Sequence, residues 1–390
     1  MHHPLSLRLR RPATTLLALA CLSASLLAGG QGAATQAPPA DVLKAVEARV
    51  APDTRLAVYD LKAEPKGGAL EVTGQVDRAS SRDAVLKALR EAGYASVVDR
   101  IAVLPDPALG ERHYAVVTVS VATMKTEASH SSELGNQLIM GMPVKVLKRE
   151  GGWYYAQSLD DQYLGYMEPE HLALMTRGEL DAFLVAPRLM VTAPFTMVRD
   201  GEAADAAPVC DLVLGDVLLA GGPAAANGRQ AVRLPDGRTG FVEAAAVMEY
   251  TAWKGSRQPT PENVERTARL FMGVPYLWGG TSPKGFDCSG YTKTVFRANG
   301  VELQRDADQQ SVQGAPVGLE GDLAQLRKGD LLFFGPRPGV TRITHVGIYL
   351  GDKLFIHCAG KVKLNSFDPA SPLYSENLRG RLVNARRLTV

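Results

Sequence analysis

The chain has 390 residues, more than one ordinary hydrophobic core accommodates, so two to four domains are expected. Its 46% hydrophobic and 22% charged residues are typical of folded protein. The 43 basic residues against 41 acidic ones leave no positive excess for binding phosphates, which argues against nucleic acid as a partner.

The amino terminus has the pattern of a secretory signal peptide. Three arginines between positions 8 and 11 precede an apolar run over residues 16–27, and small residues follow. The run is too short for a membrane-spanning helix, which needs about 20 apolar residues. We therefore predict a signal peptide over residues 1–32, no membrane span, and export to the periplasm or the outside of the cell.

The cysteines are few and show no pairing pattern. Cys21 is a candidate for lipidation, but Ala18 stands where a lipoprotein signal usually has leucine, so ordinary cleavage near residue 30 is favoured over a lipid anchor. Removal of the signal leaves Cys210, Cys288 and Cys358, an odd set that implies no disulfide framework. An unpaired cysteine in an exported protein is either buried and inert or chemically used.

Residues 38–107 are predicted to form a small α+β domain. Alternating apolar and polar residues indicate strands over 55–61, 69–76 and 97–103, and apolar positions at helical spacing indicate a helix between the last two. This order loosely resembles the periplasmic BON-like domains. No catalytic cluster lies in the segment, so adhesion or packing is the default hypothesis for it.

Residues 112–176 and 187–250 are predicted to form two small β-barrels, because short strands alternate with Gly, Asp and Pro turns. The phrases PVKVLKREGGWYYAQSLDDQYLGYM and RQAVRLPDGRTGFV resemble the bacterial SH3-like domains. The polar segment 254–259 is predicted to be a linker. It leads into a last domain, residues 258–390, where the reactive side chains are concentrated.

Two helices are predicted in this last domain. Thr260 followed by a proline marks the start of the first, and apolar residues up to Phe271 give it a buried stripe. The apolar spacing after Cys288 indicates a second helix that begins close to this cysteine. A thiol there lies at the positive end of the helix dipole, so we expect Cys288 to have a lowered pKa and to be a nucleophile.

A thiolate that attacks an amide needs a partner for its proton, and histidine suits that role near neutral pH. The run THVGIYLGDKLFIHC predicts a hairpin in which His345 opens one strand and His357 ends the other. A two-residue turn at Gly351 and Asp352 would send the two histidines to opposite faces. We predict instead an odd loop centred on Gly351, or a bulge, that brings the histidines opposite one another.

These motifs resemble the NlpC-type cell-wall cysteine peptidases, which have a reduced papain-like α+β fold. The resemblance rests on PYLWGG, FDCSG, QRDADQQ, KGDLLFF, THVGIYLG and FIHC, in the family's order. It implies that Cys288 is the nucleophile, His345 the general base and His357 the residue that orients the base. It also implies that Tyr276 helps the Cys288 amide to stabilise the oxyanion. Motif positions that line the substrate cleft are Asp287, Ser289, Arg305 and Asp306.

The two SH3-like domains add a resemblance to γ-D-glutamyl-L-diamino acid endopeptidases, which act on recycled or released muropeptides. In that subgroup the first SH3-like domain closes one end of the cleft and recognises the free amino group of L-Ala. The resemblance implies Glu133 and Tyr163 as the residues of this gate. We expect the Glu133 carboxylate to be at least partly buried, because a blocked amino terminus would then leave its charge unpaired.

Simpler roles exist for several of these residues. Packing alone is the alternative for Tyr276, while Glu133 could be a turn carboxylate and Tyr163 a barrel aromatic. Strand alternation turns Cys358 away from the preceding histidine, so it is interpreted as a buried inert thiol, and Cys210 as structural. No CxxC pair or HExxH motif supports a zinc site, so neither metal nor cofactor is expected.

The sequence thus predicts an exported α+β enzyme whose thiolate attacks the amide between γ-D-Glu and the diamino acid of peptidoglycan stem peptides. One alternative is a broader NlpC-type endopeptidase or amidase acting on intact peptidoglycan. Another is a non-catalytic protein that binds the cell wall through its SH3-like domains. The intact Cys, His, His set favours catalysis over binding alone.

Overall fold

The structure, a computed structural model, describes residues 36–223 and 227–388. The predicted signal peptide and Cys21 lie outside the described residues. None of the helices formed by the described residues has the length and apolar character needed to cross a membrane. Residues from Pro38 onward pack together as one unit.

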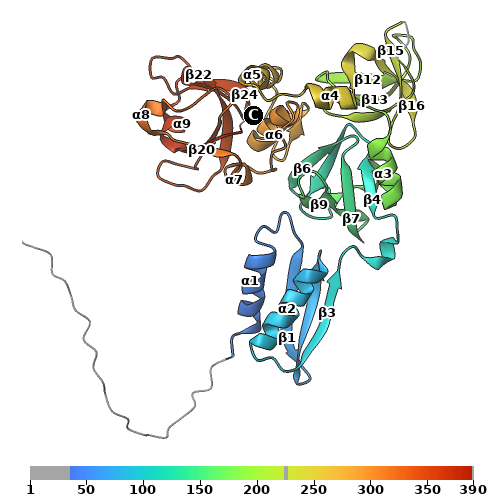
Figure 1. The fold of residues 1–390 in the computed structure, drawn as a ribbon, viewed down its shortest axis with the longest axis vertical. Helices are drawn as coiled ribbons and strands as arrows, with labels where there is room; N and C mark the ends of the chain where they lie inside the picture. The colour runs from blue at the N-terminus through green and yellow to red at the C-terminus, as the bar shows by residue number, and fades with distance from the viewer. Residues whose placement is uncertain (1–35, 224–226, 389–390) are drawn as a thin grey trace, which may run out of the picture. The chain divides into compact units, whose positions relative to one another are not determined.

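The amino-terminal domain pairs two helices with a three-stranded sheet of order β1-β2-β3 (Figure 1). Apolar side chains from both helices and the middle strand, such as Val46, Val72 and Leu89, form its core. Its elements are α1 (Pro39–Val50), β1 (Tyr59–Lys66), β2 (Ala69–Val76), α2 (Ala79–Glu91) and β3 (Val97–Val103).

Two features of this domain differ from the sequence prediction. Helix α1 was not expected, and the first strand begins at Tyr59 rather than at residue 55. Gly67 and Gly68, both at positive φ, form a two-residue turn that pairs β1 residue for residue with β2. This register starts β1 opposite Val76 and leaves residues 51–58 as a loop.

Two seven-stranded antiparallel sheets follow, and they share one topology. The first has the order β10-β4-β7-β8-β9-β5-β6, and the second, in the same direction, is β17-β11-β14-β15-β16-β12-β13. The second barrel therefore repeats the first strand for strand, as expected for two SH3-like domains. The strands of the first are β4 (Tyr114–Val117), β5 (Val121–Lys125), β6 (Leu134–Ile139), β7 (Pro143–Glu150), β8 (Trp153–Ser158), β9 (Leu164–Met167) and β10 (Leu172–Met175). Those of the second are β11 (Arg188–Val191), β12 (Phe195–Arg199), β13 (Pro208–Val213), β14 (Val217–Ala220), β15 (Arg229–Arg233), β16 (Thr239–Glu243) and β17 (Val247–Glu249).

Helices rather than loops connect these domains. Helix α3 (Arg177–Val185) lies between the barrels, and α4 (Tyr250–Ser256) follows the second. The predicted linker over 254–259 is therefore wrong in its first three residues. Helix α4 begins at Tyr250 because the carboxylate of Glu249, the residue before it, accepts the free backbone N–H groups of the first turn at 2.9 and 2.6 Å.

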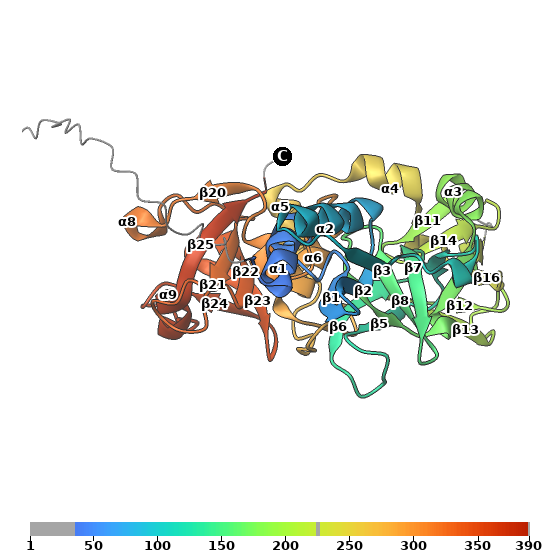
Figure 2. The same cartoon turned by 90° about the horizontal axis from the view of Figure 1, so that it is seen from below.

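The carboxy-terminal domain contains a six-stranded sheet of order β20-β25-β21-β22-β23-β24, grouped at one end of Figure 2. Helix α6 packs on β22 and β23, and it begins at Cys288 as predicted. With the sheets and helices above, the predicted α+β class is confirmed. The helices are α5 (Pro261–Arg269), α6 (Cys288–Arg297), α7 (Ala307–Gln310), α8 (Glu320–Leu323) and α9 (Glu376–Arg381). The strands are β18 (Thr281–Ser282), β19 (Gly285–Phe286), β20 (Ala315–Val317), β21 (Leu331–Phe334), β22 (His345–Gly351), β23 (Leu354–Ala359), β24 (Lys361–Ser366) and β25 (Leu382–Arg387).

The hairpin of β22 and β23 carries both histidines on one face. Asp352 and Lys353, both at positive φ, form its two-residue turn, and a bulge just before Gly351 shifts the register. The predicted bulge is confirmed, but the predicted direct pairing of the histidines is wrong. Continuing the register past the bulge places His357 opposite Gly347, diagonal to His345.

The first barrel is anchored on the helix that begins with Cys288. Asp161, in the loop between β8 and β9, forms a buried ion pair with Lys293 of α6 at 3.3 Å, and the same loop places Asp160 3.6 Å from Arg297. The side chains of Asp161 and Lys293 are only 3% and 7% exposed. This anchor fixes the loop that carries Tyr163 against α6.

Substitution of Asp161 by alanine should lower the free energy of unfolding by about 3 kcal/mol, because the Lys293 ammonium is left buried without its partner. Urea denaturation followed by tryptophan fluorescence measures the change. A double variant that also carries Lys293→Met removes both charges and should recover most of the loss. A double variant as unstable as Asp161→Ala would contradict the anchor.

Candidate active site

Side chains from the first barrel and the carboxy-terminal domain meet around a cavity of about 550 Å³. It brings together residues up to 289 positions apart, from Arg55 to Thr344. His345 directly follows the cavity residue Thr344. The residues predicted from sequence that line it are Glu133, Tyr163, Tyr276, Asp287, Cys288, Ser289, Arg305 and Asp306.

Cys288 is the first residue of α6, and Asp287 caps the helix. The Asp287 carboxylate accepts the backbone N–H of Gly290 at 2.7 Å and that of Gly279 at 3.0 Å. The FDCSG motif needs glycine at its end, because a Cβ at Gly290 would stand 2.0 Å from the carbonyl oxygen of Gly280. The motif thus fixes where the thiol lies.

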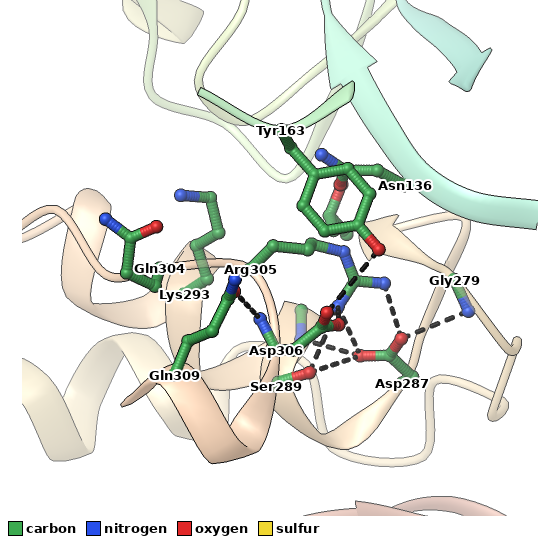
Figure 3. A network of polar contacts seen from close by, with 12 residues as sticks. Asn136, Tyr163, Gly279, Asp287, Ser289, Lys293, Gln304, Arg305, Asp306 and Gln309 are labelled. Atoms are coloured by element: carbon green, nitrogen blue, oxygen red, sulfur yellow. Dashed lines mark hydrogen bonds and ion pairs between the residues drawn. The ribbon is translucent and has the colours of Figure 1, made fainter. Parts of the chain in front are cut away.

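Arg305 ties this cap into a buried network, shown in Figure 3. Its guanidinium donates to Asp287 at 2.5 Å and to the Ser289 hydroxyl at 3.0 Å, and the residue is 1% exposed. Asp287 and Arg305 therefore hold the start of α6 in place as well as lining the cavity. Asp306, the next residue, turns its carboxylate towards the Tyr163 hydroxyl.

A chain of hydrogen bonds sets the tautomers of the two histidines. Asn365 donates its amide to the Leu373 carbonyl, so its oxygen accepts Nε2–H of His357 at 2.9 Å. Nδ1 of His357 is then an acceptor, and it takes Nε2–H of His345 at 2.7 Å. This leaves Nδ1 of His345 unprotonated, as a general base requires.

The local geometry allows the histidines to meet and places the sulfur beside them. A Cβ at Gly347 would stand 3.1 Å from the Cβ of His357, so glycine leaves room for the imidazole. The backbone N–H of Val346, the residue after His345, donates to the Cys288 sulfur. The thiol thus lies at the start of β22.

The predicted lowering of the Cys288 pKa is wrong for the ligand-free protein. Burial raises the pKa of this thiol to about 12, and the adjacent Asp287 carboxylate adds to the rise. The N–H groups of Val346 and Ser289 and the Arg305 charge act in the opposite direction but do not overcome desolvation. A position at the amino terminus of a helix is therefore insufficient to lower the pKa of a thiol whose sulfur is also removed from water.

Burial likewise keeps both imidazoles neutral. It lowers the pKa of His345 well below 6.5, with the nearby His357 adding to the effect, and it lowers the pKa of His357 to about 4. The resting site at neutral pH is therefore a thiol beside a neutral imidazole rather than an ion pair.

Two hydrogen-bond donors belong to residues that line the same cavity as the thiol. The backbone N–H of Cys288 is in the first turn of α6, and no acceptor is recorded for it among the described residues. Tyr276 is half-buried in the cavity wall, and burial raises the pKa of its hydroxyl, so the hydroxyl keeps its proton. Both groups can donate a hydrogen bond to the carbonyl oxygen of a group that the sulfur attacks, as this oxygen becomes negatively charged.

Glu133 and Tyr163 lie at the barrel side of the cavity. Tyr163 is 9% exposed, and its hydroxyl donates to Asp306 at 3.4 Å. The expected burial of Glu133 is wrong, because its carboxylate is exposed and accepts the indole N–H of Trp278 at 2.6 Å. Trp278 itself is 62% exposed, so it cannot shield the carboxylate from water.

The cysteines outside the site behave differently from Cys288. Cys358 is fully buried, and its thiol donates to the Phe286 carbonyl at 3.2 Å. It packs with the core on the face of β23 opposite His357, as strand alternation predicted. Cys210 is a free, half-buried thiol packed against the core of the second barrel.

Sequence reasoning missed several residues of the site, among them Asn365 and Arg55. Asn365 could have been found by extending the hairpin, since a short turn at Gly360 places it on β24 diagonal to His357. No motif or spacing in the sequence pointed to Arg55, because it lies in a loop of the amino-terminal domain and reaches the cavity only through the tertiary fold.

Alkylation of Cys288 by iodoacetamide should accelerate about tenfold for each pH unit between 6 and 9, because the thiolate fraction of a thiol with a pKa near 12 grows in that proportion. Site-resolved mass spectrometry measures the rate separately from Cys210. A rate that stays constant down to pH 6 would instead indicate a thiolate–imidazolium pair.

Asn365→Ala should reduce kcat by about tenfold, less than the loss of a general base, because His357 loses the acceptor that sets its tautomer. Steady-state hydrolysis with a check of the melting temperature measures this. Asn377→Ala, an exposed asparagine on α9, is the matched control. Equal kcat in the two variants would exclude an orienting role for Asn365.

Two family models match the chain. The NlpC/P60 family matches residues 273–387, and the bacterial dipeptidyl-peptidase Sh3 domain matches residues 125–172. A crystal structure of an NlpC/P60 family protein from Bacillus cereus superposes with a TM-score of 0.60 at 24% identity, covering 70% of this chain and 99% of that one. This likeness shows a shared fold.

Two of the similar proteins are named as dipeptidyl-peptidases. The gamma-D-glutamyl-L-lysine dipeptidyl-peptidase of Bacillus subtilis is 40% identical over 117 residues, which are 30% of this chain and 37% of the relative. Dipeptidyl-peptidase 6 of Lysinibacillus sphaericus is 30% identical over 274 residues, which are 68% of this chain and 95% of the relative. Because a relative is matched over nearly its whole length, and the cysteine and histidines stand on the elements that the motifs predicted, this chain belongs to the NlpC/P60 family of cysteine peptidases.

Proposed function

We propose that this protein is an endopeptidase that hydrolyses the amide between γ-D-glutamate and the diamino acid of peptidoglycan stem peptides bearing a free amino-terminal L-Ala. The observation that carries the proposal is the cavity itself, which Cys288 shares with Glu133 and Tyr163 of the first barrel. The name of the Bacillus subtilis relative supports the choice of bond, and the presence of the barrel residues in the cavity supports a short substrate.

In this proposal His345 takes the thiol proton on Nδ1 as the sulfur attacks the γ-carbonyl carbon of D-Glu. Because the resting pair is neutral, proton transfer accompanies attack rather than preceding it. The Cys288 backbone N–H and the Tyr276 hydroxyl donate to the carbonyl oxygen as it gains negative charge.

Collapse of the tetrahedral intermediate breaks the C–N bond. His345 returns the proton to the leaving amine of the diamino acid, which leaves a thioester between Cys288 and L-Ala-γ-D-Glu. Water then attacks the thioester, with the same imidazole as base, and the dipeptide is released. His357 and Asn365 hold that imidazole in one tautomer through both steps.

At the other end of the substrate, a free ammonium would find three oxygen acceptors: the carboxylates of Glu133 and Asp306 and the hydroxyl of Tyr163. An acylated amine carries no positive charge to pair with these carboxylates, and an amine joined to glycan would also meet the barrel. Fragments already released from the wall are therefore the proposed substrates. The sequence pattern of residues 1–32 supports export as the route by which the enzyme meets them.

Mature protein incubated with L-Ala-γ-D-Glu-diaminopimelate should release L-Ala-D-Glu, detected by mass spectrometry, and should leave an N-acetylated copy largely intact. Cys288→Ala should abolish release. Equal cleavage of the acetylated peptide, or digestion of purified sacculi, would favour a broader endopeptidase. Binding to sacculi without any turnover would favour a cell-wall binding role.

A further inference from the structure

The loop over residues 51–58 connects α1 with β1 of the amino-terminal domain and reaches the substrate cavity. Arg55 of this loop lines the cavity together with Asp306 and Asp308. We propose that Arg55 is a positioning residue for the closed end of the cleft, through which the amino-terminal domain takes part in selecting a free amino terminus. The inference rests on the proposed function and adds a third domain to the site.

The guanidinium of Arg55 is held by carboxylates from two domains. Nη1 donates to Asp306 at 2.8 Å and to Asp308 at 2.9 Å, while Nη2 donates to Asp308 and to Asp53, each at 2.8 Å. Nε donates to Asp53 at 2.9 Å. All five donors of the guanidinium are thus used, which gives it one orientation.

The backbone of the same loop is held by the first barrel. The Arg55 carbonyl accepts the N–H of Leu164, the residue after Tyr163, at 2.9 Å. The Leu56 carbonyl accepts from the Gln157 amide at 2.7 Å. Arg55 is therefore bonded through its backbone to the residue next to Tyr163 and through its side chain to Asp306, the two residues whose side chains meet in the cavity.

The charge of Arg55 acts on Asp306. Burial raises the pKa of Asp306, whereas Arg305 and Arg55 act to lower it, so the two guanidinium groups favour the charged carboxylate. Arg55 bonds the same oxygen that accepts from Tyr163, and this fixes the direction in which the carboxylate faces the cavity. Without Arg55, the acidic groups at Asp53, Asp306 and Asp308 would lose their shared cation and the end of the cleft would be open.

The test uses binding of the dipeptide L-Ala-γ-D-Glu, the proposed product, to full-length mature protein carrying Cys288→Ala. Addition of Arg55→Ala should weaken binding about tenfold by titration calorimetry and leave the weak binding of N-acetylated dipeptide unchanged. In the otherwise native enzyme, Arg55→Ala should raise KM for the free tripeptide about tenfold with kcat within about twofold. It should lower the preference for free over acetylated peptide by the same factor.

Arg82→Ala is the matched control, because Arg82 pairs with Asp99 in the same domain, has a similarly exposed side chain, and does not line the cavity. It should behave as the parent protein. If Arg55→Ala lowers the melting temperature more than this control, Asp308→Asn replaces it, since that change weakens two of the five bonds at a half-exposed residue. Asp308→Asn should also weaken dipeptide binding and lower the preference for free over acetylated peptide.

Dipeptide binding and selectivity that are unchanged by Arg55→Ala and Asp308→Asn would overturn this inference while leaving the proposed function intact. No dipeptide binding to the Cys288→Ala protein, together with no tripeptide turnover, would overturn the proposed substrate and this inference with it.

Discussion

The buried ion pair between Arg305 and Asp287 is the constraint from which the site is built. Asp287 caps the helix that begins at Cys288, and Arg305 holds that cap from a position that water does not reach. Breaking such a pair leaves an uncompensated buried charge, so both residues are required together. Since Asp306 follows Arg305 directly, the same short segment also brings a carboxylate to the Tyr163 hydroxyl.

The burial that fixes the geometry of the site also changes the protonation of its reactive groups. The sulfur, both imidazoles and the Tyr276 hydroxyl are all shifted towards their neutral forms. A neutral site does not pair tightly with ions from solution, and it develops charge only when a carbonyl oxygen can share it with preorganised donors. Reactivity is thus coupled to the presence of a substrate.

Ion pairs join the domains around the barrel side of the cavity. Lys293 with Asp161 holds the Tyr163 loop on α6, and Arg55 with Asp306 and Asp308 brings the amino-terminal domain to the same place. Each pair combines residues more than 100 positions apart, so neither appears as a local motif. In the barrel–helix anchor the charges are buried, whereas the Arg55 cluster is about one-third exposed and is screened by solvent.

The sequence by itself determined the family, the helix start at Cys288, the placement of His345 and His357 on one hairpin, and the eight candidate residues that meet at the cavity. The helix start and the hairpin follow from local rules of helix capping and strand alternation, whereas the family and the eight candidate residues are what the resemblance of the motifs implied. Only the tertiary structure decided the neutral thiol, the exposed Glu133 and the contacts of Asn365 and Arg55. Desolvation and ion pairing depend on which distant segments surround a group, and no spacing along the chain records that.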